Sequence, residues 1–198
     1  MEAQGHVGQV STARPGGRSI IERLIAEGPD GLILNVGAGV DLVSAQRPGQ
    51  CVVDFDLVVP SNRSTRFVVG EVNSTPLKSG ICSMILAKDV LEHVSDPIGA
   101  MRELRRVAQD NCLLVATVPR AIPRVVWDDP THVRGFTARA VATLVDSSGW
   151  TLNNAPGRIG ALPGAGRLRL EGYLETLMRV PGLGHRFGTN WVFRCTPA

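Results

Sequence analysis

The sequence predicts an α/β protein with a doubly wound, mostly parallel sheet and helices on both faces. Short apolar runs of strand length alternate with longer segments in which apolar residues recur at helical spacing. The short runs are apolar almost throughout, which is typical of strands that are buried on both faces of a parallel sheet. The chain has 198 residues, enough for one domain with a sizeable core.

Six segments are predicted to be strands because each is a short apolar run next to turn residues or charges. Along the chain they are residues 32–36, 51–56, 66–69, 83–87, 112–118 and, near the end, 190–195. The first run ends in a glycine turn, and Pro119 stops the fifth.

The first two helices are predicted from capping residues and apolar spacing. Ser19 is suited to cap a short helix, which the Gly28-Pro29 pair ends. A second helix begins at Pro97, with Asp96 as its N-cap and proline at the first helical position.

The second half of the chain gives two further helices. Thr137 caps a helix that Gly149 closes. Residues 154–166 are rich in glycine and proline, so we expect a loop there. Residues 167–180 have apolar side chains at helical spacing and are predicted to form a helix.

Composition excludes several classes of function. The net charge is +3 and no block of Lys or Arg occurs, so we expect no nucleic-acid partner. No run of 18 apolar residues occurs, which predicts no membrane span. Residues 1–17 lack an apolar signal-peptide core and are interpreted as a flexible leader before a single domain, 18–198.

The cysteines and histidines indicate the compartment and argue against a metal. Four cysteines occur without a Cys-x-x-Cys spacing, which favours buried thiols in a reducing, cytoplasmic compartment. Because the histidines and cysteines are scattered along the chain, we expect no metal site and no metal requirement.

The glycine turn after the first strand is a candidate ligand site. Gly37, Ala38 and Gly39 lie where open α/β sheets bind ligands, beyond the carboxyl end of a strand. Glycine there lets a ligand approach the backbone closely. A dinucleotide fingerprint needs a third glycine where Leu42 stands, so a nucleotide-binding oxidoreductase is disfavoured.

Acidic residues follow the next two strands. Asp56 lies 17 residues after Gly39, a distance at which an acid can accept hydrogen bonds from ribose hydroxyls. Asp54 shares its strand face, so either carboxylate can serve. After the third strand, Glu71 and Val72 offer an acceptor for an adenine amine and an apolar side chain for its ring.

The fourth motif makes the pattern specific. Residues 87–97 read Ala-Lys-Asp-Val-Leu-Glu-His-Val-Ser-Asp-Pro, and they follow the glycine turn, the acid and Gly-Glu-Val in that order. This ordered set resembles the class I S-adenosylmethionine-dependent methyltransferases, and most closely the small-molecule enzymes with a VLEHV signature. The resemblance covers about residues 32–150 and implies a Rossmann-like fold with a seven-stranded sheet.

The resemblance implies a cofactor site for S-adenosylmethionine. The glycine turn would meet the methionine moiety, Asp56 the ribose, and Glu71 with Val72 the adenine. Asn35 stands where the family usually has an acid, and Asp41 where it usually has a third glycine. The implied cofactor-binding set is Asn35, Gly37, Ala38, Gly39, Asp54, Asp56, Glu71, Val72, Ala87, Lys88 and His93.

The acceptor is expected beyond the fifth strand. If a hydroxyl is methylated, His132 or Asp129 is the best candidate base, although a polar surface loop is an equally good interpretation of that segment. We expect residues 120–132 and the 167–180 helix to form the pocket. The acceptor would be a small molecule, with a saccharide or a lipid-linked molecule as options.

Two matters stay open at this point. The departures at Asn35 and Asp41 also fit a non-catalytic homologue that keeps the fold as a binding or regulatory module. A homodimer is compatible with the sequence.

Overall fold

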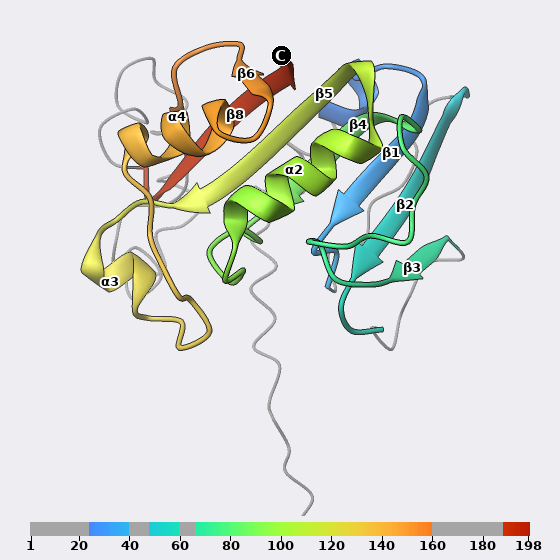
Figure 1. The fold of residues 1–198 in the computed structure, drawn as a ribbon. Coiled ribbons are helices and arrows are strands. Elements are labelled where there is room, and N and C mark those ends of the chain that lie inside the picture. The colour runs from blue at the N-terminus through green and yellow to red at the C-terminus, as the bar shows by residue number, and fades with distance from the viewer. Residues whose placement is uncertain (1–23, 40–47, 60–65, 160–187) are drawn as a thin grey trace, which may run out of the picture.

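The computed structural model describes residues 24–39, 48–59, 66–159 and 188–198. They form one eight-stranded sheet in the order β3-β2-β1-β4-β5-β8-β6, with β7 also paired to β8 (Figure 1). The strands are β1 Gly31–Val36, β2 Gln50–Asp56, β3 Phe67–Val69, β4 Cys82–Lys88, β5 Ala108–Pro119, β6 Trp150–Leu152, β7 Gly157–Ile159 and β8 Asn190–Pro197.

The sheet is parallel from β3 to β5 and antiparallel beyond. Strands β1 to β5 pair in parallel, whereas β8 runs antiparallel to β5, and β6 and β7 run antiparallel to β8. From β1 the chain adds β2 and β3 on one side of the sheet and then crosses over to add β4 and β5 on the other side, so the switch point lies between the neighbours β1 and β4. This switch point is where doubly wound sheets bind ligands, beyond the carboxyl ends of the strands.

Alternate residues of the strands build a core on each face of the sheet. On one face Leu34, Ile85 and Leu114 pack with the helices α2 and α4, which Figure 1 shows in front of the sheet. On the other face Ile33 and Met84 pack with residues of the 24–27 helical turn. Because successive side chains of a strand point to opposite faces, fully apolar strands give two cores.

The described helices are α2 Pro97–Val107, α3 Pro123–Val126 and α4 Ala138–Asp146. The predicted caps are confirmed, because Asp96 accepts from the Gly99 amide and Thr137 from the Ala140 amide. The short α3 was not predicted. The start of the Ser19 helix and the whole 167–180 helix lie outside the described residues.

The predicted doubly wound, mostly parallel fold is confirmed, with two corrections. The sheet has eight strands instead of seven. Residues 157–159, expected within a loop, form β7 because their backbone pairs antiparallel with residues 190–192 of β8. No helix among the described residues is long and apolar enough to cross a membrane.

An ion pair within α2, between Glu103 and Arg106, also binds Thr75 in the segment that precedes β4. Glu103 accepts two hydrogen bonds from Arg106, at 2.7 and 2.8 Å, and two more from the amide and hydroxyl of Thr75, both at 2.8 Å. The Arg106 guanidinium is the main reason that the pKa of Glu103 falls from 4.5 to about 2. The charged carboxylate is therefore favoured in the folded protein.

We expect Glu103→Gln to lower the free energy of unfolding by about 1.5–3 kcal/mol at neutral pH, the range for hydrogen bonds to a charged group. The pKa of Glu103 is depressed in the folded state, so its contribution is present above about pH 4.5 and is lost as the pH falls towards 2. Urea unfolding should therefore show the difference between wild type and variant shrinking over that interval. Asp146→Asn, an exposed acid on α4, should leave the difference near zero at every pH.

Candidate functional site

The predicted site residues gather at one edge of the sheet. They lie at or just beyond the carboxyl ends of β1, β2, β3, β4 and β5, which point to the same side in Figure 1. Parallel pairing forces this arrangement, because the ends of parallel neighbours share an edge. Motifs that are far apart along the chain are thereby brought to one side of the molecule.

The glycine turn after β1 has the backbone that glycine favours. Gly37 and Gly39 have φ values of +66° and +48°, in the left-handed region. A Cβ on Gly37 would lie 2.3 Å from Cγ2 of Val90, so a side chain at this position would collide with the loop after β4. Gly37 therefore allows the loops after β1 and β4 to pack against each other.

Asp56 closes the glycine turn. Its Oδ2 accepts a 2.8 Å hydrogen bond from the Gly39 amide, and its Oδ1 accepts one of 3.2 Å from the Val58 amide. The amides of Gly37 and Ala38 donate to the Phe55 carbonyl. The candidate ribose acid and the turn expected to meet the methionine moiety thus form one hydrogen-bonded unit.

Asp54 has a different environment from Asp56. It is 1% exposed, and its Oδ1 accepts a 2.8 Å hydrogen bond from Nδ2 of Asn35, which is 5% exposed. The two residues are paired in the parallel register of β1 and β2. An acid at position 35 would face the Asp54 carboxylate directly, whereas the amide of Asn35 donates to it. Asparagine at position 35, which departs from the resembled family's usual acid, thus suits the buried Asp54 beside it.

The remaining predicted cofactor residues divide by exposure. Val72 and Ala87 belong to the hydrophobic core, at 8% and 0% exposure. Glu71 is exposed and forms an isolated bridge to Ser74. Lys88 ends β4 and is partly exposed.

Asp89 was missed by the sequence analysis. It has a φ of +50°, the only positive value at a non-glycine residue among those described. Its Oδ1 accepts 2.8 Å hydrogen bonds from the hydroxyl of Thr117 on β5 and from Nδ2 of Asn190 on β8. Backbone strain of this kind gathers at functional sites. The signal in the sequence was its position directly before the VLEHV segment.

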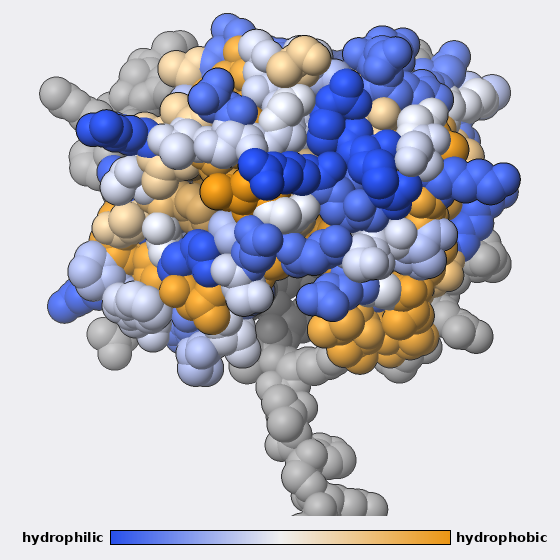
Figure 2. All heavy atoms as spheres, in the orientation of Figure 1, coloured by the Kyte–Doolittle hydropathy of each residue, from blue (hydrophilic) through white to orange (hydrophobic). Residues whose placement is uncertain are grey.

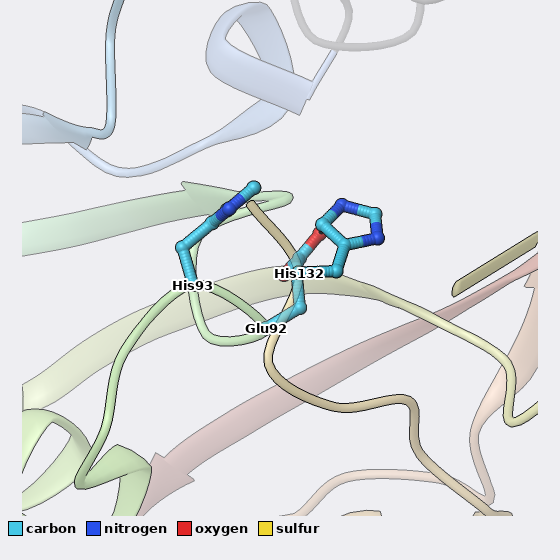
Figure 3. A group of neighbouring side chains, drawn as sticks. All are labelled: Glu92, His93 and His132. Carbon is cyan, nitrogen blue, oxygen red and sulfur yellow. The ribbon is translucent and has the colours of Figure 1, made fainter. Parts of the chain in front are cut away.

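Glu92, His93 and His132 form a cluster between the loops after β4 and β5 (Figure 3). The Val133 amide donates to the Glu92 carbonyl at 2.9 Å, which joins the two loops. The two imidazole rings meet edge to face, with centroids 4.7 Å apart. His132 Nε2 lies 3.9 Å from Glu92 Oε1 and 3.9 Å from Asp129 Oδ2. Glu92 was not among the predicted residues.

Hydrogen-bond partners fix the tautomers of both histidines. His132 Nδ1 lies 2.8 Å from the Val126 carbonyl oxygen, which can only accept, so this nitrogen carries the proton. His93 Nδ1 lies 3.0 Å from the Thr131 hydroxyl, which itself donates to Asp129, so Nδ1 of His93 is again the donor. In both neutral rings Nε2 keeps its lone pair.

The pKa values of two carboxyl groups at the cluster, Glu92 and Asp129, are shifted in opposite directions. Burial, with a smaller contribution from the charge of Asp89, raises the pKa of Glu92 from 4.5 to about 8. The hydrogen bonds from Thr131 lower the pKa of Asp129. Near neutral pH, therefore, Asp129 is the carboxylate beside His132, while Glu92 is largely protonated.

Fold and site define an α/β protein that presents a glycine turn, the acid Asp56 that closes it, and a histidine–carboxylate cluster along one sheet edge. Residues 34–116 match a family model described as a methyltransferase domain. The matched residues run from β1 into β5 and include the glycine turn, Asp56 and the VLEHV segment, so this part of the chain resembles a methyltransferase domain and supports an enzyme that uses S-adenosylmethionine. No curated protein sequence matches the chain at a significant level.

Solved structures of similar fold carry the same description. An S-adenosylmethionine-dependent methyltransferase from Archaeoglobus fulgidus has 13% identity and a TM-score of 0.63, with 90% of this chain and 94% of that chain covered. One from Aquifex aeolicus has 12% identity and a TM-score of 0.61, covering 91% and 89%. The 1,6-didemethyltoxoflavin-N1-methyltransferase of Burkholderia thailandensis, solved with S-adenosylhomocysteine, has 15% identity and a TM-score of 0.59, covering 92% and 77%. At these identities the likeness shows the fold.

Proposed function

We propose that the protein transfers the methyl group of S-adenosylmethionine to a small-molecule acceptor, at the edge where the loops after β4 and β5 meet. The acceptor class includes saccharides and lipid-linked molecules. The observation that carries this proposal is the histidine–carboxylate cluster. The cluster lies near the glycine turn, because Gly37 packs against Val90, which belongs to the same loop as Glu92 and His93. The Burkholderia neighbour is named for a small-molecule acceptor.

In this proposal the cofactor lies over the glycine turn. Asp56 takes the ribose, Glu71 and Val72 lie beside the adenine, and the backbone of Gly37 to Gly39 meets the methionine moiety. Lys88 and His93 line the side on which the methyl group is presented, and Ala87, which is fully buried, supports the end of β4 from the core. Asp54 is almost fully buried and accepts a hydrogen bond from Asn35. We therefore propose that Asp54 positions Asn35 and does not bind the ribose.

The chain's own residues would act on the acceptor by position and by proton acceptance. The sulfonium makes the methyl carbon electrophilic, so the protein mainly aligns the acceptor oxygen or nitrogen and excludes water. His132 is the proposed base, because its proton lies on Nδ1 and its Nε2 lone pair is available. Asp129 is close enough to stabilise the imidazolium that forms.

Three further features belong to this proposal. The enzyme acts in the cytoplasm, works on a small molecule rather than a nucleic acid, and consists of one domain from residue 18 to 198. A non-catalytic binding module is the competing function. The intact acid at Asp56 and the assembled cluster around His132 favour the enzyme.

The cofactor site is tested by calorimetry with S-adenosylmethionine and S-adenosylhomocysteine. Asp56→Ala should weaken binding by about 1.5–3 kcal/mol, the range for hydrogen bonds to a charged group. Asp56→Asn keeps an oxygen for the Gly39 amide and separates loss of charge from loss of the turn. Asp110→Ala, an exposed acid at the start of β5, is the control. Absence of binding heat and of a thermal shift at millimolar ligand would refute the cofactor site, and unchanged affinity in Asp56→Ala would refute the ribose role.

A further inference from the structure

Three side chains with metal-binding atoms meet where the loops after β4 and β5 touch. Glu92 and His93 come from the first loop and His132 from the second, and one donor atom of each lies within 4.8 Å of the other two. Figure 3 shows the three side chains beside one another. The cluster joins residues about 40 positions apart, which is why spacing along the chain predicted no metal site.

The carboxyl group of Glu92 is the observation that points to a ligand. The residue is 1% exposed, and its Oε2 has no hydrogen-bond partner within the part of the chain that the structure describes. Its Oε1 lies 3.9 Å from Nε2 of His132, too far for a hydrogen bond. Leaving a buried polar atom unpaired costs free energy. A cation bound by the Glu92 carboxylate and the two imidazoles would give this buried carboxylate a partner.

Both imidazoles are oriented as metal ligands usually are. In each ring Nδ1 donates to an oxygen of the protein, the Val126 carbonyl for His132 and Thr131 for His93. Such an outer hydrogen bond fixes the ring and leaves Nε2 as the ligating atom in most histidine metal sites. The orientation exists before any ion is bound, so little ordering is required on binding.

We propose that Glu92, His93 and His132 bind one divalent ion of the zinc class. Two imidazole nitrogens and one carboxylate oxygen suit Zn²⁺ or Co²⁺, whereas Mg²⁺ and Ca²⁺ prefer oxygen ligands throughout. Bond lengths of about 2.0–2.2 Å require the donor atoms, now within 4.8 Å of one another, to draw together, with a small shift of the loops that carry them. Three protein ligands leave a fourth position for water or a small anion.

The ion and the proposed base compete for one lone pair. Once Nε2 of His132 is bonded to a metal, it cannot accept the acceptor's proton. Zinc is therefore expected to inhibit methyl transfer, and the absence of a metal requirement stays a prediction from the sequence. This consequence rests on the proposed function, whereas the binding site does not.

The site is tested on the full chain, stripped with chelator and titrated with Co²⁺ alone. Wild type should take up one Co²⁺ with visible d–d absorption that Zn²⁺ abolishes. Glu92→Gln, His93→Ala and His132→Ala should each weaken Co²⁺ binding at least about tenfold. Even the loss of a residue that only hydrogen-bonds to a metal ligand typically lowers metal affinity by about 10–100-fold. His185→Gln, a histidine elsewhere in the chain, is the matched control. Circular dichroism of each variant separates lost binding from lost folding.

Two results would overturn the site: a wild-type chain without saturable Co²⁺ absorption, or folded ligand variants that bind as tightly as His185→Gln. The inhibition is measured separately, as turnover with and without Zn²⁺ at a concentration that fills the site. Zn²⁺ binding without loss of turnover would refute the base role of His132 and leave the metal site standing. Loss of turnover in His132→Ala, together with no Co²⁺ binding in wild type, would refute the metal site and support the base role of His132.

Discussion

Replacing His132 by alanine is expected to lower turnover by about 10²–10⁴-fold while leaving affinity for S-adenosylmethionine nearly unchanged, provided that the acceptor atom must lose a proton. The reason is geometric. The Nδ1 proton is held by the Val126 carbonyl, so Nε2 is left as the proton acceptor at the junction of the loops after β4 and β5. The measurement pairs initial rates at saturating acceptor with calorimetry of the cofactor.

His132→Asn is the companion variant, because its side-chain amide can still donate to the Val126 carbonyl but offers no basic nitrogen. It should lose turnover as alanine does if the base role is right, and recover turnover if His132 only holds the loop. Asp129→Asn should also lower turnover, since the carboxylate lies 3.9 Å from Nε2. Asp128→Asn, its exposed neighbour, is the control. Full turnover in both His132→Ala and Asp129→Asn would end the base hypothesis, and loss of cofactor binding would move this loop to the cofactor site.

The second large effect concerns stability. Asn35→Asp, which introduces the acid that the resembled methyltransferases usually have at this position, should destabilise the protein by about 3–5 kcal/mol near neutral pH, the cost of a buried charge without a counterpart. The new carboxylate would lie where Nδ2 of Asn35 now contacts Asp54 at 2.8 Å, with both residues almost fully buried. Two carboxylates at that distance cannot both ionise, so one must stay protonated in the folded state.

The pH dependence gives this prediction a sign. One carboxyl of the pair has a raised pKa in the folded variant, so the folded state binds a proton that the unfolded state releases. The variant's stability therefore falls, relative to wild type, as the pH rises above the ordinary pKa of an aspartate. Urea unfolding between pH 5 and pH 8 measures it.

The exchanged variant Asn35→Asp with Asp54→Asn is the control, because it keeps one amide and one carboxylate in contact. Its stability should return most of the way to wild type. If Asn35→Asp alone is as stable as wild type at pH 8, the Asn35–Asp54 contact does not have the role assigned to it.

Local features of the sequence were sufficient for most of the fold. The parallel strands could be predicted because they are short apolar runs, and α2 and α4 because Asp96 and Thr137 are capping residues before amphipathic segments. Prediction failed for β7, whose three residues pair with β8 through the backbone and need no apolar pattern. It failed also for α3, which has only four residues.

The position of the candidate site at the sheet edge followed from the sequence too. Glycines and acids directly after apolar strands must share an edge once the strands are parallel. The sequence therefore determined the fold class, the edge and the order of the cofactor motifs.

Only the tertiary structure decided which side chains meet. The register of β1 against β2 places Asn35 on Asp54 and leaves Asp56 to hold the Gly39 amide, although the two acids share a strand face. The packing of the loops after β4 and β5 buries Glu92 beside His132. Periodicity and capping depend on neighbours along the chain, whereas these contacts depend on strand register and loop packing, which bring together residues that no local pattern connects.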